Sequence, residues 1–167
     1  LRNTFGLTVE EAGQLATLSN LNSKSVDFTL DTITEQVNQF NRINRTSINH
    51  GNVLKEVSQT SDDILAIFSR KPEELTKAVA VSRRLGVELK TLESIAESLL
   101  NFETSIENEL QAQLLTGQEI NLAKAREAAL SNDLATVGEE IFSNTVDLSR
   151  YAQMNRISQQ GLADALG

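Results

Sequence analysis

The side chains that most often perform catalysis are sparse in this chain. His50 is its one histidine, and it lies in a polar stretch between Asn49 and Gly51. A lone histidine cannot build a multi-histidine metal site, and the chain has no cysteine to supply the missing ligands. We therefore expect His50 to be a solvated turn residue.

Carboxylates come in adjacent pairs, which are Glu10/Glu11, Asp62/Asp63, Glu73/Glu74 and Glu139/Glu140. Neighbouring side chains on a helix point about 100° apart, so such pairs do not converge on one substrate atom. Three of the pairs fall in predicted first helical turns, where the macrodipole stabilises negative charge. General acid–base catalysis by two carboxylates needs a cleft with unlike environments instead.

Other catalytic motifs are missing from the sequence. It has no Glu-x-x-His pattern for a di-iron bundle, no Gly-x-Ser-x-Gly nucleophile elbow and no phosphate-binding glycine loop. We therefore predict that the protein is not an enzyme, and that it uses no cofactor, metal or small-molecule substrate.

The composition of the chain argues against two classes of binding partner, nucleic acids and membranes. The chain has 167 residues, is 40% hydrophobic and carries a formal net charge of −8. Such a charge disfavours direct nucleic-acid binding, which needs clustered Lys and Arg. No run of about 20 apolar residues predicts a membrane span. The first residue is Leu1 rather than Met, so we expect a piece of a longer chain.

Apolar residues recur with helical spacing along most of the chain, and strand-like alternation is absent. We therefore expect an all-α fold of amphipathic helices, arranged as a bundle or as chained helical hairpins. Thr8 and Glu11 form a capping box, Pro72 suits a first turn, and Gly86 and Gly117 suit helix ends. The expected helices cover residues 9–19, 25–43, about 53–57, 61–68, 72–85, 88–115, 121–131, 132–143 and 153–166. A boundary near Gly86 would divide the chain into segments 1–86 and 87–167, although one continuous helical domain is an alternative.

Two apolar stripes are the candidate packing or interaction residues. The first follows a heptad-like spacing of four and three, and the second runs along the long helix predicted over 88–115. The stripe residues are Val26, Leu30, Ile33, Val37, Phe40, Leu92, Ile95, Leu99, Phe102, Ile106 and Leu110. The polar residues between them on the long helix, Glu103, Glu107, Glu109 and Gln111, are expected to face solvent.

Residues 98–130 contain three consecutive motifs. They are Leu-Leu-x-Phe-Glu-x-Ser-Ile, then Glu-Leu-x-Ala-x-Leu-Leu-Thr-Gly, then Asn-Leu-x-x-Ala-Arg-x-x-Ala-Leu. This pattern resembles segments of phage tail tape measure proteins. The resemblance spans roughly residues 53–167 and is strongest over 85–130 and again over 154–167. Residues 1–52 match more loosely, mainly through Gly-Leu-Thr-x-Glu-Glu.

The resemblance implies a structural segment of a very long helical chain. Tape measure proteins lie in the lumen of the growing phage tail, set the length of the tail tube and assemble in the host cytoplasm. Their partners would be tail tube and tail assembly proteins, or other copies of the same chain. Two alternatives stay open: a generic helical adaptor or signalling bundle that binds partner helices, and a toxin-like or secreted helical effector.

Overall fold

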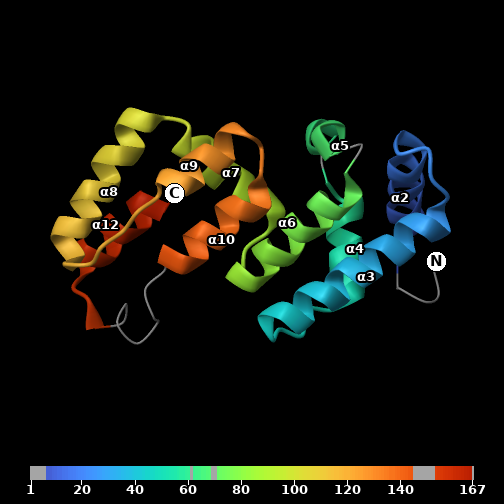
Figure 1. Cartoon of the computed structure of the whole chain (residues 1–167), viewed down its shortest axis with the longest axis horizontal. Helices are drawn as coiled ribbons and strands as arrows, with labels where there is room; N and C mark the ends of the chain where they lie inside the picture. The colour runs from blue at the N-terminus through green and yellow to red at the C-terminus, as the bar shows by residue number, and fades with distance from the viewer. Residues whose placement is uncertain (1–6, 61, 69–70, 145–152, 167) are drawn as a thin grey trace. The chain divides into compact units, whose positions relative to one another are not determined.

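The computed structural model describes residues 7–60, 62–68, 71–144 and 153–166, and every regular element within them is a helix (Figure 1). This confirms the all-α fold class. The chain divides into two units, Leu1–Lys90 and Thr91–Gly167. Residues of each unit contact mainly other residues of the same unit. The division follows Lys90, slightly beyond the boundary expected at residue 86. No helix in the described residues is both long enough and apolar enough to cross a membrane.

The first unit is a bundle of short helices. Its helices are α2 (Val9–Leu21), α3 (Val26–Asn44), α4 (His50–Ser58), α5 (Asp62–Phe68) and α6 (Pro72–Leu85). The capping box is present at α2, since Thr8 Oγ1 accepts from the Glu11 amide at 3.1 Å and Glu11 Oε2 accepts from the Thr8 amide at 2.8 Å. Pro72 occupies the first turn of α6, and Gly86 ends that helix with φ +78°. Ser61, which we included in the helix over 61–68, lies outside the described residues.

Helices α3 and α6 form the centre of this unit, and α2 and α4 also pack on α3. The first predicted stripe faces inward from α3: Leu30, Ile33, Val37 and Phe40 are buried, while Val26 at the first turn is half-buried. Opposite them, α4 buries Val53 and Leu54, and α6 buries Leu75 and Val79. The residues spaced four and three apart on α3 therefore pack in the hydrophobic core of the first unit, against other helices of the same chain.

The long helix predicted over 88–115 is two helices in the structure, α7 (Leu89–Leu99) and α8 (Phe102–Thr116). The physical reason lies at Asn101, whose backbone leaves the helical region at ψ 80°. Its side chain accepts a hydrogen bond from the Thr104 amide and so caps α8. The Leu100 and Asn101 amides bond three residues back, to Glu97 and Ser98, as in a tightened last turn.

In the second unit, α8 pairs with α12 (Arg156–Leu166) and α9 (Ala123–Leu130) pairs with α10 (Leu134–Asn144) (Figure 1). Helices α8 and α12 run antiparallel, because Ser158 Oγ donates to the Leu115 carbonyl at 2.7 Å and Asn108 donates to the Asp164 carbonyl at 3.0 Å. Asn144, the last residue of α10, connects that helix to the segment just before α9. Its Oδ1 accepts from the Asn121 backbone amide at 2.9 Å.

Candidate interaction surface

His50 and the Glu73/Glu74 pair, which the sequence offered as candidates for chemistry, lie at helix ends. His50 is the first residue of α4 rather than part of a turn, and its Nε2 lies 2.8 Å from Asn38 Oδ1. The described residues include no group of three or more His, Cys, Asp or Glu side chains that could hold a metal ion. Glu73 and Glu74 lie in the first turn of α6, as the macrodipole argument expects.

Two carboxylates of the first unit bind backbone amides. Glu11 accepts from the Thr8 amide and also from Gln59 Nε2 at 2.9 Å. The backbone hydrogen bond with Thr8 is the main reason that the pKa of Glu11 lies below its ordinary value, and the charge of Lys55 lowers it further. Glu56 pairs with Arg83 and accepts from the Leu89 amide at 2.6 Å. Glu11 therefore links the start of α2 to the end of α4, and Glu56 links α4 to α6 and to the start of α7.

A buried ion pair holds α9 against α8. Arg126 Nη1 lies 2.7 Å from Glu109 Oε2, and the two side chains are only 9% and 12% exposed. Arg126 also donates to Ser105 Oγ at 3.1 Å, and Glu109 accepts from the Leu122 amide at 3.1 Å. We expected Glu109 to face solvent, and the structure corrects that expectation because Arg126 and the amide satisfy the buried carboxylate.

This network joins the three motifs of residues 98–130. Ser105 belongs to the first motif, Glu109 to the second, and Leu122 and Arg126 to the third. Ala112, the alanine of the second motif, is fully buried on the same side of α8. The motif positions thus describe how α8 and α9 pack. No sequence signal paired Glu109 with Arg126, since the two lie on different helices.

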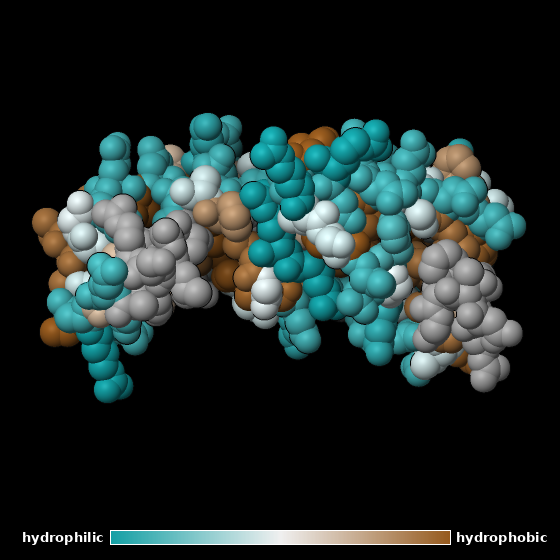
Figure 2. Space-filling model, turned by 90° about the horizontal axis from the view of Figure 1, so that it is seen from below, coloured by the Kyte–Doolittle hydropathy of each residue, from teal (hydrophilic) through white to brown (hydrophobic). Residues whose placement is uncertain are grey.

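The opposite side of α8 is apolar and faces solvent. Phe102, Ile106, Leu110 and Leu114 follow one another at intervals of four residues and are 42%, 45%, 55% and 86% exposed. Side chains four apart lie on one face of a helix, so they form a continuous row. We call these four residues the outer face of α8. Figure 2 shows hydrophobic atoms at its left edge, the side on which Figure 1 places α8 and α12.

The predicted stripe of the long helix therefore divides at Asn101. Leu92, Ile95 and Leu99 of α7 are buried, whereas Phe102, Ile106 and Leu110 of α8 belong to the outer face. The apolar spacing in the sequence continues across residues 100 and 101. Because the helix stops there and α8 begins anew at the Asn101 cap, the apolar residues of α7 and α8 do not share one helix face. Leu114 is the most exposed member of the row, and it was not among the stripe residues that we predicted.

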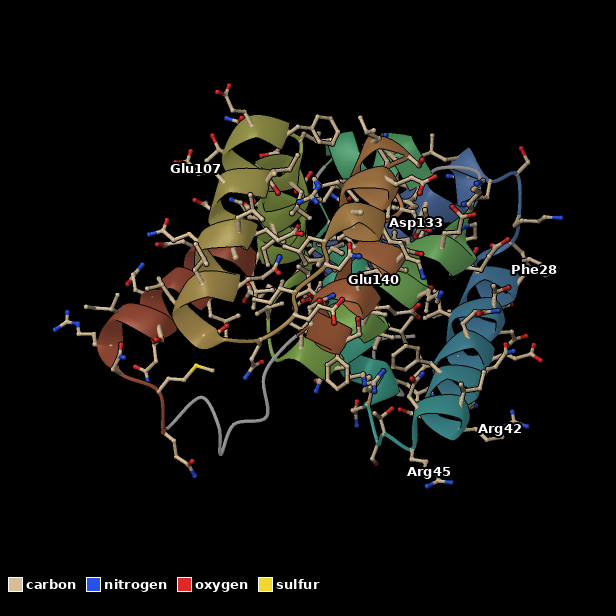
Figure 3. All side chains as sticks on the ribbon, turned by 60° about the vertical axis from the view of Figure 1, so that its left-hand side comes forward. Phe28, Arg42, Arg45, Glu107, Asp133 and Glu140 are labelled. Atoms are coloured by element: carbon tan, nitrogen blue, oxygen red, sulfur yellow. The ribbon has the colours of Figure 1, made fainter. Side chains whose placement is uncertain are left out.

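Acidic side chains border the outer face. Glu103 and Glu107 are both exposed, and Figure 3 shows Glu107 pointing away from the neighbouring helices. Gln111 continues this border one turn further along α8. Helix α8 contains three glutamates and no lysine or arginine, and one of the three, Glu109, is neutralised by Arg126 on the inner side.

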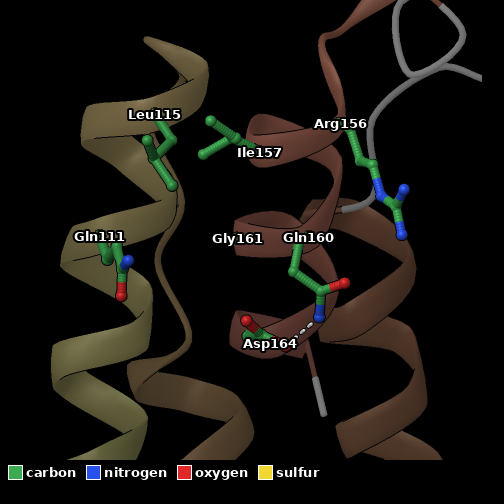
Figure 4. Close-up of a pocket in the computed structure, with 7 residues that line it drawn as sticks. All are labelled: Gln111, Leu115, Arg156, Ile157, Gln160, Gly161 and Asp164. Atoms are coloured by element: carbon green, nitrogen blue, oxygen red, sulfur yellow. Dashed lines mark hydrogen bonds between the residues drawn. The ribbon is translucent and has the colours of Figure 1, made fainter.

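A hollow of about 310 Å³ lies between α8 and α12, and Gln111 and Leu115 line it on the α8 side (Figure 4). Leu115 and Ile157 point toward each other across it, while Gln160 donates to Asp164 at 2.7 Å on its rim. Ile157 of α12 is 68% exposed. Gln111, Arg156, Gln160 and Asp164 also line the hollow, so its wall combines apolar and polar side chains.

Comparison with known proteins finds no matching family model, no matching curated protein and no matching solved structure.

Proposed function

We propose that this chain is a structural segment of a phage tail tape measure protein that helps to set tail tube length and assembly. The observation that carries the proposal is the motif series over residues 98–130, which resembles that family. Its positions Ser105, Glu109 and Arg126 form the buried network between α8 and α9. A motif built from packing residues supports an architectural role.

The helical composition also supports the proposal, because an α-helix converts residue count into distance at about 1.5 Å per residue. As one continuous helix, the whole chain would span roughly 250 Å. The helices are instead short and paired, so the segment would act as packed units or rearrange inside the tail lumen. Tail tube and assembly proteins, or other copies, would be its partners, in the host cytoplasm during assembly and later in the virion tail.

Mass spectrometry of purified particles tests this assignment. Peptides from residues 91–167 should come from the tail fraction, as part of one polypeptide much longer than this chain. The reading frame should lie beside genes for tail tube and baseplate proteins. Peptides found only in infected-cell lysate, from a short polypeptide absent from the particle, would contradict the assignment.

A helical adaptor that binds partner helices is the second candidate, and the outer face of α8 favours it. Exposed apolar rows of this kind are typical of surfaces that receive an amphipathic helix. An adaptor would be encoded as a short independent gene, so the same particle experiment separates the two candidates.

A further inference from the structure

We propose that the outer face of α8 binds an amphipathic helix whose apolar stripe is flanked by lysine or arginine. The inference does not depend on the phage assignment, because it rests on the exposure, spacing and charge of α8 itself.

The spacing of the outer face determines the shape of its partner. Residues at i, i+4, i+8 and i+12 form one of the ridges that helices use when they pack in globular proteins. The row begins at Phe102 and ends at Leu114. A second helix laid along this row could pack an apolar ridge of its own beside it.

The charge of α8 determines which helix fits. Glu103 and Glu107 border the row, and α8 has no basic residue that could neutralise them. A helix with Lys or Arg beside its apolar stripe would place positive charge opposite both glutamates. Charge at the rim of an interface acts mainly on specificity and association rate, while the apolar row supplies most of the affinity.

The same charge disfavours two other occupants. A second copy of α8 would bring another acidic helix onto the row, and like charges oppose that pairing. An anionic bilayer would also repel Glu103 and Glu107. The basic helix is therefore the occupant that the surface matches in both shape and charge.

Accessibility of the row in the full chain is the first test. The chain has no cysteine, so a single introduced thiol reports its own surroundings. Ile106→Cys should react with a thiol reagent at a rate within about tenfold of that of Glu107→Cys on the exposed border. Ala112→Cys, at a fully buried position of the same helix, should react far more slowly. A rate for Ile106→Cys as slow as that for Ala112→Cys would mean that the chain itself covers the row, which would overturn the proposal.

Binding of two matched peptides to the full chain is the second test. Both peptides are helices of about 15–18 residues with leucine at i, i+3, i+4 and i+7, flanked by lysine in one and by glutamate in the other. The lysine peptide should bind about tenfold more tightly at low salt. The double variant Glu103→Lys/Glu107→Lys should reverse that preference. Leu110→Asp should abolish binding of both peptides, whereas Leu130→Asp, at an exposed leucine of α9, should leave binding unchanged.

Three kinds of result in the binding assays would also overturn the proposal. The first is peptide binding that ignores the features of the row, which means equal affinity for the two peptides or binding that survives Leu110→Asp. The second is a concentration-dependent dimer in sedimentation that Leu110→Asp removes, which would assign the row to a second copy. The third is binding to vesicles of phosphatidylcholine and phosphatidylglycerol that Leu110→Asp removes, which would assign the row to a lipid surface.

Discussion

Gly161 of α12 lies directly against Leu115 of α8: a Cβ atom at position 161 would approach Leu115 Cδ1 to 2.6 Å. The neighbouring residues facing α8 include Ser158 and Ala165, which are small and buried. Small residues let the two helix backbones approach closely, and the Ser158 hydroxyl bonds the Leu115 carbonyl in this close contact.

Substitution of Gly161 should depend strongly on side-chain shape. In Gly161→Ala, Leu115 Cδ1 can rotate into the adjacent hollow, and alanine favours helix over glycine by about 1 kcal/mol. We therefore expect Gly161→Ala to change the free energy of unfolding by less than about 1 kcal/mol. Gly161→Val should destabilise the chain by about 1–3 kcal/mol, because a branched Cβ overfills the contact. Urea denaturation measures both, with Ala163→Val at an exposed position of α12 as the control. Equal stability of the two Gly161 variants would contradict the close contact.

Removal of Arg126 should destabilise the second unit. Arg126→Ala leaves the Glu109 carboxylate buried without its cation, which costs about 3 kcal/mol or more in comparable buried pairs. Arg126→Met combined with Glu109→Gln removes both charges and should recover much of that loss. Unfolding measurements on Arg126→Met, Glu109→Gln and their combination give the coupling energy. Additive effects would mean that the two side chains do not interact.

Glu11 should make the stability of the first unit depend on acid. Its pKa is lowered in the folded chain, mainly by the Thr8 amide, so the unfolded chain binds the proton more readily. The stability that ionised Glu11 contributes is therefore fully present when the pH is above the pKa of Glu11 in the unfolded chain. It is lost as the pH falls through the lower pKa of Glu11 in the folded chain. Denaturation from pH 7 down to pH 3 should show a smaller loss for Glu11→Gln than for the wild type. Glu10→Gln, at the exposed neighbouring residue, should follow the wild-type curve, and a Glu11→Gln curve identical to the wild type would reject this role.

The local signals in the sequence located helix ends well. The Thr8/Glu11 box, Pro72, Gly86 and Gly117 all act within one turn of their own helix, so the residues alone define the ends. The break at Asn101 was missed because the apolar spacing continues through it, and the register ends only because the Asn101 side chain accepts from the Thr104 amide and caps α8. The burial of Glu109 was missed for a different reason, since its partner Arg126 lies on another helix.

Truncation of two predicted stripe residues should separate core from surface. Ile33→Ala removes a fully buried side chain from α3 and should destabilise the chain by about 2–5 kcal/mol. Ile106→Ala, on the outer face of α8, should cost less than about 1 kcal/mol because the side chain is already half in solvent. Chemical denaturation of both variants measures the difference. A cost for Ile106→Ala as large as that for Ile33→Ala would mean that the chain buries its outer face in solution.

The length of assembled tails tests the proposed function most directly. Under the proposed function, a phage encodes this chain within a longer reading frame, and an in-frame duplication of residues 1–167 would add one extra copy of the segment. We predict tails that are uniformly longer, by up to roughly 250 Å if the added residues become continuous helix and by less if they stay as packed units. Electron microscopy of purified particles gives the length distribution, and a synonymously recoded single copy is the control. Particles that carry the longer protein but have tails of unchanged length would contradict the account.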